Sequence, residues 1–198
     1  MKIYDISQPI LGCNVYPGDP IPEKISIKEM EKGDMYNLSS VNMCVHNGTH
    51  IDAPRHFIKD GNNVEDICLD KFIGFAYVVE HNGEVTAKDA ISIIEKAREC
   101  DVRAAKRILL KGNVVVTEEA AHVFAEAELH LLGNESQSVG PENAPMEVHL
   151  ILLSSEVVLL EGVRLDKVQE GVYFLNAAPI NLNGCEGAPC RAVLVDLE

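Results

Sequence analysis

The sequence predicts a mixed α/β domain, and two observations support that fold class. Short β-rich segments dominate the first third and the last quarter of the chain, whereas strand-like and helix-like segments alternate between them. The 198 residues, of which 46% are hydrophobic and 24% charged, suit one globular domain. Since neither a repeat nor a long linker interrupts the chain, we expect residues 1–198 to form a single unit around one mixed sheet.

The first eighty residues are expected to consist of strands and loops. A cluster of turn residues at 17–22 precedes two short extended segments, 24–28 and 39–45. Residues 72–80 form an apolar, β-rich run that ends before the turn dipeptide Asn82-Gly83. This run predicts a buried strand.

Three helices are expected in the middle of the chain. The first runs from Thr86 to about residue 100, because Thr86 and Asp89 resemble a capping box and apolar residues recur at helical spacing. The second is an Ala-rich segment from 117 to about 129, and the third runs from 145 to about 154 with Pro in its first turn. Strands are expected at 107–110, 131–132, 157–160, 172–182 and 191–197.

The charge balance argues against several classes of partner. The chain has 17 Lys and Arg against 31 Asp and Glu, a net charge of −14, so binding to nucleic acid or to an anionic membrane surface is not expected. No apolar run approaches the roughly 20 residues that cross a bilayer. Asp5 and Pro9 interrupt the N-terminal segment before a signal sequence could form, and the six cysteines contain no CxxC pair. We therefore expect a cytoplasmic protein with free thiols.

Residues 46–56 contain four potential metal ligands, His46, His50, Asp52 and His56. In an extended strand, positions 46, 48, 50 and 52 would share one face, and the opposite face, which includes Val41, would pack into a core. Two imidazoles and a carboxylate on one face, with Gly48 allowing close approach, suit Zn or Mn. Such an ion lowers the pKa of bound water and polarises a carbonyl, while a neighbouring imidazole transfers a proton. The pattern predicts a metal site with hydrolytic chemistry.

The segment HNGTHIDAPRHF, residues 46–57, resembles the HxGTHxDxPxHF signature of the cyclase family of metal-dependent hydrolases, which includes bacterial kynurenine formamidase and isatin hydrolase. Residues 16–20 (YPGDP) and 183–193 (NGCEGAPCRAV) also resemble family segments. The resemblance implies a swivelling β/β/α fold and a homo-oligomer, either a dimer or a tetramer. It implies metal ligation of one or two Zn or Mn ions by His46, His50, Asp52, His149 and Glu161, with His56 as a further ligand or as the general base.

The chain also departs from the family pattern. Only four residues, 113–116, separate Gly112 from the second predicted helix, where relatives carry a longer TGW-like insertion, and the chain has no Trp. The family loop that resembles GIDSPSVD is replaced by residues 133–140. In that loop, we expect either substrate contacts or an ordinary polar turn at Asn134, Glu135, Ser136 and Gln137.

Three functions agree with these observations. The leading interpretation is a hydrolase acting on a small-molecule substrate, namely a small amide, formamide or cyclic amide, as an arylformamidase does. One alternative is a metal-dependent cyclase or lyase that acts on a polyketide-like carbonyl substrate. The other is a non-catalytic protein that binds a metal or a small ligand.

Overall fold

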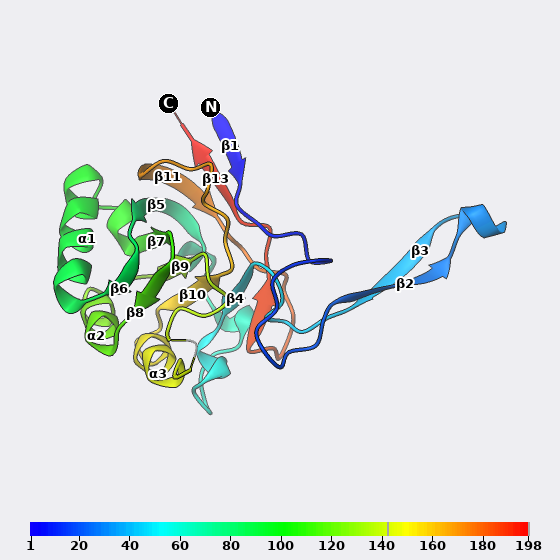
Figure 1. Cartoon of the computed structure of the whole chain (residues 1–198), viewed down its shortest axis with the longest axis horizontal. Coiled ribbons are helices and arrows are strands. Elements are labelled where there is room, and N and C mark those ends of the chain that lie inside the picture. Colours follow the sequence, from blue (N-terminus) through cyan, green and yellow to red (C-terminus); the bar gives the residue numbers. More distant parts are fainter. Residues whose placement is uncertain (142, 198) are drawn as a thin grey trace.

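A computed structural model describes residues 1–141 and 143–197. Its main feature is a nine-stranded mixed sheet (Figure 1). The four central strands pair in parallel and the strands on either side pair antiparallel. In spatial order the strands are β1 (Lys2–Asp5), β13 (Val193–Asp196), β11 (Gly171–Asn176), β5 (Ile73–Glu80), β7 (Arg107–Lys111), β9 (Leu131–Asn134), β10 (Val158–Glu161), β4 (His50–Asp52) and β12 (Gly187–Pro189). The mixed α/β fold class is confirmed.

Three α-helices in the described part of the chain lie together on one side of this sheet (Figure 1). They are α1 (Ala87–Cys100), α2 (Glu118–Glu126) and α3 (Met146–Ser154). The Thr86 hydroxyl accepts a hydrogen bond from the Asp89 backbone N–H, and the Asp89 carboxylate accepts one from the Thr86 N–H, which is the predicted capping box. The helix predicted to reach residue 129 ends at Glu126, because Glu128 adopts a left-handed φ of 54°.

The sheet has a buried apolar layer on each face. Along β5, Tyr77 and Val79 join the layer under the helices, whereas Ala76 and Val78 join the layer on the opposite face, as the two-residue period of a strand requires. Long connecting segments cover that opposite face with apolar residues such as Phe72. The helices therefore cover one face of the sheet and the connecting segments cover the other.

Most predicted strands agree with the structure within one or two residues, but the segment 172–182 is shorter. The strand β11 ends at Asn176, and Pro179, which has no N–H for a ladder, makes only an isolated bridge with Cys190. The edge strand β12 was not predicted, because Gly187 and Pro189 are typical of turns.

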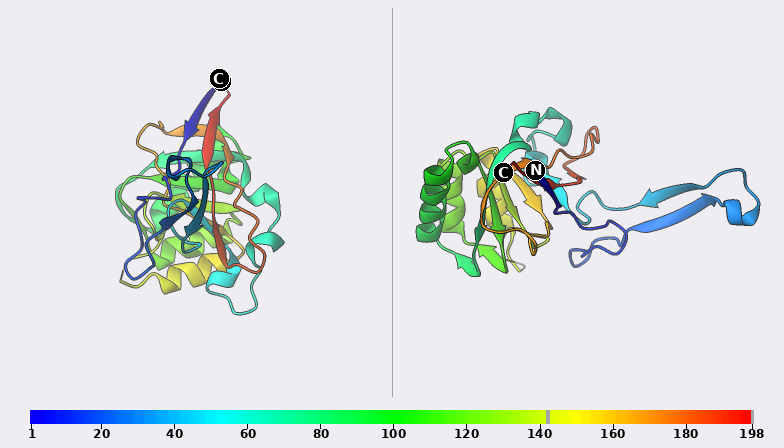
Figure 2. Two further views of the ribbon diagram at one scale, coloured as in Figure 1. Left: turned by 90° about the vertical axis from the view of Figure 1, so that its right-hand side faces the viewer. Right: turned by 90° about the horizontal axis from the view of Figure 1, so that it is seen from above.

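A hairpin extends far from the body of the protein (Figures 1 and 2). It consists of β2 (Glu23–Lys28) and β3 (Leu38–Asn42), joined through the short 3-10 helix Met30–Lys32, and we call residues 23–42 the arm. The two predicted extended segments are confirmed here, although β3 ends three residues before the predicted 45. The expectation that Val41 packs into a core is wrong, because the arm leaves the body and the Val41 side chain is half exposed.

A third, two-stranded sheet pairs β6 (Gly83–Val85) in parallel with β8 (Val114–Val116). The chain thus passes from β7 to α2 through a single short strand, β8. None of the described helices combines the length and apolar character that a membrane span requires.

Candidate metal centre

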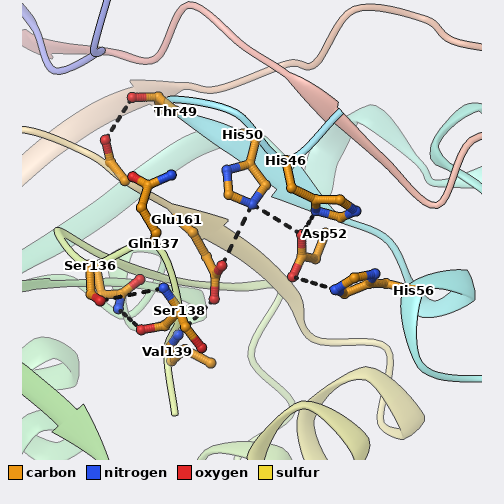
Figure 3. A network of polar contacts seen from close by, with 12 residues as sticks. His46, Thr49, His50, Asp52, His56, Ser136, Gln137, Ser138, Val139 and Glu161 are labelled. Carbon is orange, nitrogen blue, oxygen red and sulfur yellow. Dashed lines mark hydrogen bonds and ion pairs between the residues drawn. The ribbon is translucent and has the colours of Figure 1, made fainter. Parts of the chain in front are cut away.

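The candidate site lies where the parallel part of the sheet meets the antiparallel strand β4. In the β4–β10 pairing, Glu161 is directly opposite His50, and Asp52 follows His50 on the same face. The helix α3 brings His149 to this face. Figure 3 shows His46, His50, Asp52, His56 and Glu161 pointing toward one another, although they come from segments more than a hundred residues apart.

The expectation that one extended strand runs through positions 46–52 is wrong. Only residues 50–52 are in a strand, and the chain turns before them. The Asn47 side chain accepts a hydrogen bond from the Cys44 N–H (2.9 Å), and Gly48 has a φ of +69°. A Cβ at Gly48 would lie 3.1 Å from Ile10, so the glycine serves the turn and its packing instead of ligand approach.

The turn nevertheless delivers His46 to the predicted cluster, where its Nδ1 lies 2.8 Å from Asp52 Oδ1. The edge strand β12 makes room for this ring, because a Cβ at Gly187 would lie 2.6 Å from His46 Cε1. Sequence reasoning missed Gly187, and the only available signal was its place inside the family-like segment 183–193.

The donor atoms are spaced as ligands of a common ion would be. His50 Nε2 lies 3.3 Å from Asp52 Oδ1 and 3.6 Å from Glu161 Oε2. His149 Nε2 lies 3.4 Å from Glu161 Oε1 and 3.7 Å from Asp52 Oδ2. Donors bonded to one tetrahedral ion at about 2.0–2.1 Å lie about 3.3 Å apart, whereas direct N–H···O hydrogen bonds are shorter, about 2.9 Å. This spacing fits a metal ion among these side chains.

Hydrogen bonds to backbone carbonyls fix the orientation of two imidazoles. His50 Nδ1 donates to the Gly48 carbonyl (3.1 Å), and His149 Nδ1 donates to the Pro145 carbonyl (2.7 Å). Each Nε2 is therefore left as the potential metal-binding nitrogen. In addition, the buried atoms Asp52 Oδ2 and His46 Nε2 have no hydrogen-bond partner, which is costly unless an ion satisfies them.

The surroundings shift the pKa values of the two carboxylates in opposite directions. Burial alone would raise the pKa of Asp52, but the hydrogen bond from His46 and the attraction of the His46 and His50 rings outweigh it and hold that pKa well below its usual range. Burial and the nearby Asp52 charge raise the pKa of Glu161. The Glu161 carboxylate also accepts a hydrogen bond from the Val139 N–H (2.7 Å). Two buried carboxylates side by side favour a divalent cation between them.

The residues form two overlapping sets that could each hold an ion. One set is His46, His50 and Asp52, and the other is Asp52, His149 and Glu161. Asp52 belongs to both sets. Five of the predicted metal ligands are therefore brought together, and the two sets suit one or two ions.

His56 lies beside these sets. It ends the 3-10 turn Pro54–His56, its ring centroid is 4.1 Å from that of His46, and its Nε2 is 3.9 Å from Asp52 Oδ2. Burial, together with the neighbouring His46 and His149, outweighs the attraction of Asp52 and lowers the pKa of His56 to about 4. The ring is therefore neutral near pH 7 and can accept a proton.

The cluster forms one wall of a cavity of about 250 Å³, which we call the metal cavity after the candidate ligands in its lining. Its lining adds residues that sequence reasoning did not assign to the site, namely Tyr16, Asp19, Phe57, Ser138 and Pro145. Tyr16 and Asp19 belong to the family-like YPGDP segment, and Phe57 ends the signature, so both motifs carried an unused signal.

The four predicted substrate-contact residues occupy different positions. Gln137 lines the metal cavity, but its side-chain amide donates to the Gly48 carbonyl and accepts from Gln8. Glu135 and Ser136 line an adjacent cavity, where the Glu135 carboxylate accepts hydrogen bonds from two backbone N–H groups. Asn134 is buried and lines neither cavity.

Comparisons with known proteins identify the family of the chain. A family model described as "Putative cyclase" matches residues 4–141. The kynurenine formamidase of Salinibacter ruber is 32% identical over 99% of this chain and 98% of its own length. The kynurenine formamidase of Bacillus cytotoxicus is 32% identical over 96% of this chain and 95% of its own length.

Comparison with solved structures also finds relatives that share this fold. A structure described as a potential metal-dependent hydrolase with cyclase activity matches with a TM-score of 0.84 at 30% identity, covering 100% of this chain and 98% of that one. Isatin hydrolase A from Labrenzia aggregata matches with a TM-score of 0.81 at 20% identity, covering 98% of this chain and 93% of that one, a likeness of fold alone. With its signature, its cluster of His, Asp and Glu side chains and these relatives, the chain belongs to the cyclase family.

Proposed function

We propose that this protein is a divalent-metal-dependent hydrolase of a small amide, formamide or cyclic amide. The observation that carries the proposal is the convergence of His50, Asp52, His149 and Glu161 at ligand spacing on one wall of a cavity. A bound divalent ion would polarise the substrate carbonyl and lower the pKa of water. The relatives that are kynurenine formamidases support a carbon–nitrogen bond as the target.

In this proposal, His46, His50 and Asp52 hold the first ion. His149 and Glu161, with Asp52 shared, provide a second position. The mixed set of imidazole and carboxylate donors suits Zn and Mn alike.

His56 acts as the general base in this proposal, and then as the acid that protonates the leaving nitrogen. Support comes from its position, because it lies outside both ligand sets yet within 3.9 Å of Asp52. Its low pKa keeps it neutral and ready to take a proton from water.

Within the loop of Asn134, Glu135, Ser136 and Gln137, the last three residues form a wall of the substrate site in this proposal, whereas Asn134 lines neither cavity. Gln137 supports this placement most directly, since it lines the metal cavity and also contacts the turn before β4 through Gly48.

The experiment uses protein reconstituted with Zn or with Mn and N-formylkynurenine as the substrate, with deformylation followed by absorbance. We expect turnover with at least one ion and a loss of about 10²- to 10⁴-fold in kcat for His56→Ala at unchanged metal content. Metal loss in His56→Ala would instead make His56 a ligand. Stoichiometric metal binding without hydrolysis of any amide, lactam or lactone would overturn the hydrolase and favour the cyclase or the binding protein.

We also propose that the protein is a homo-oligomer assembled through the arm. Support comes from the apolar side chains that the arm exposes to solvent, which are unusual in such number for a monomer. They are Ile25, Ile27, Met30, Met35, Tyr36, Leu38 and Val41.

A further inference from the structure

A tight turn at Tyr16-Pro17-Gly18-Asp19 contributes to the lining of the metal cavity. The Asp19 N–H donates to the Tyr16 carbonyl (3.0 Å), and Gly18 has a φ of +99°. Pro followed by Gly with positive φ is the pattern of a type II turn. The turn holds Tyr16 and Asp19 at its two ends, and both side chains line the cavity.

Among the described residues that line the cavity, Asp19 is the only Asp, Glu, Lys or Arg outside the two ligand sets. Apart from His56, the other lining residues outside the ligand sets are uncharged: Tyr16, Phe57, Gln137, Ser138 and Pro145. Among the described residues that line this cavity and the adjacent one of about 380 Å³, none is Lys or Arg. A substrate carboxylate would therefore meet no Lys or Arg side chain among these residues.

The charges of the site point to a cationic ligand group. Asp19 belongs to neither ligand set, so its carboxylate is not needed to hold an ion at either position. Glu186, whose Oε1 lies 3.7 Å from His46 Nε2, adds a further negative charge near the site. The Asp19 carboxylate receives a contact from the Cys44 thiol (4.0 Å), and a thiol is only a weak hydrogen-bond donor. Most of the acceptor capacity of Asp19 is thus left for a ligand.

We propose that Asp19 is a specificity-determining residue that binds a protonated amine of the substrate. The substrate class is then an amide or formamide that carries an ammonium group, with its apolar part against Phe57 and Pro145. The inference rests on the proposed hydrolase function for turnover, but not for binding.

The test compares three formanilides with Zn- and Mn-reconstituted protein at pH 7. They are the cationic 4-(aminomethyl)formanilide, the neutral 4-(hydroxymethyl)formanilide and the anionic 4-formamidobenzoate. We expect kcat/KM to be about fivefold higher for the cationic than for the neutral compound, with a decrease of this ratio at high ionic strength. The anionic compound should be the poorest substrate.

Asp19→Asn should bring the ratio of the cationic to the neutral compound close to one. Asp166→Asn removes the same charge from an exposed site and should leave the ratio unchanged. Calorimetric titration of the metal-loaded variants with 4-aminobenzylamine and 4-aminobenzyl alcohol measures the same preference without turnover.

The outcomes separate the two proposals. A binding preference for the cation that Asp19→Asn abolishes, without hydrolysis of any formanilide, would support the inference while the hydrolase assignment fails. Equal use of the cationic and neutral compounds, or a preference that Asp19→Asn leaves intact, would overturn the inference.

Discussion

Both candidate metal positions depend on Asp52. Its Oδ1 faces His46 and His50, whereas its Oδ2 is buried without a hydrogen-bond partner and lies 3.7 Å from His149 Nε2. Asp52→Asn keeps the shape of the side chain but removes its negative charge. We therefore expect at least about a tenfold loss of metal affinity, measured by chelator competition and by metal analysis. Asp166→Asn is the charge-matched control, and full metal occupancy in Asp52→Asn would contradict the shared-ligand role.

Gly187 gives a second prediction at the residue scale. In Gly187→Ala the new Cβ would lie 2.6 Å from His46 Cε1, so the ring must move. We expect metal affinity to fall by about tenfold, as it does when residues that orient ligands are changed. Adding the change to His46→Ala should have a smaller effect, because the displaced ring is absent and only the contact of the new Cβ with the Ile51 carbonyl oxygen (2.9 Å) remains. Equal losses in both backgrounds would show that Gly187 acts through the strand instead.

The candidate ligands could be named from the sequence, whereas the residues that surround them could not. His46, His50 and Asp52 lie within seven positions, and the family signature identifies them. Gly187 makes room for His46, and Asp19 lines the cavity, each from a segment distant in the sequence, so no local spacing reveals them. The extended strand expected at His46 failed because Gly48 adopts a positive φ, which the alternation of polar and apolar residues does not indicate.

At the scale of elements, Tyr77 on β5 connects two strands through Glu170, which precedes β11. Its hydroxyl donates to the Glu170 carboxylate (3.0 Å), and burial together with this carboxylate raises the pKa of Tyr77 to about 12. Because the pKa of Tyr77 is higher in the folded than in the unfolded protein, the interaction stabilises the folded state fully at pH values below the unfolded pKa of about 10. This stabilisation is lost as the pH rises toward the folded pKa of about 12.

We therefore expect Tyr77→Phe to lower the free energy of unfolding by about 1 kcal/mol at pH 8. The difference from the unmodified protein should narrow at pH 11, as measured by denaturant titration. Tyr36→Phe, on the exposed arm, is the matched control and should change little at either pH. A gap that stays constant up to pH 11 would show that the hydrogen bond does not carry the effect.

Elements with strong local signals agreed with the sequence. The capping box at Thr86 fixed the start of α1, and the apolar run of β5 fixed a central strand. Elements defined by tertiary pairing did not: β12 contains Gly and Pro and exists because it pairs with β4. The site depends on this second kind of element, since β12 provides the space for His46.

At the scale of the whole molecule, the site lies at the carboxyl ends of parallel strands. Glu161 is the last residue of β10, and the loop that follows Asn134, the last residue of β9, carries Gln137 and Ser138 to the cavity. The strand β10 pairs in parallel with β9 on one side and antiparallel with β4 on the other. The loops that follow β9 and β10 therefore separate from the chain around β4, and the candidate site lies between them. The sheet order thereby determines where the ligands gather, although no single segment of sequence contains that order.

The arm is the feature of the whole molecule that a monomer explains least. Both strands of the arm expose apolar side chains, including Ile27 on β2 and Val41 on β3, and an exposed β-hairpin of this length also offers unpaired strand edges. A second copy of the chain would bury these groups, and a symmetric pair would satisfy both arms at once.

Replacing residues 24–41 by Asn-Gly tests this idea, because Glu23 and Asn42 are paired across the hairpin and a two-residue turn can join them. We expect light scattering after gel filtration to show an oligomer for the full chain and a monomer for the shortened one. The shortened chain should retain its metal content, since neither ligand set includes an arm residue. Ile27→Thr combined with Tyr36→Thr keeps the arm but removes part of its apolar surface, and should weaken the oligomer in the same direction. A full chain that is monomeric at micromolar concentration would refute assembly through the arm, because its apolar side chains would then remain exposed to water.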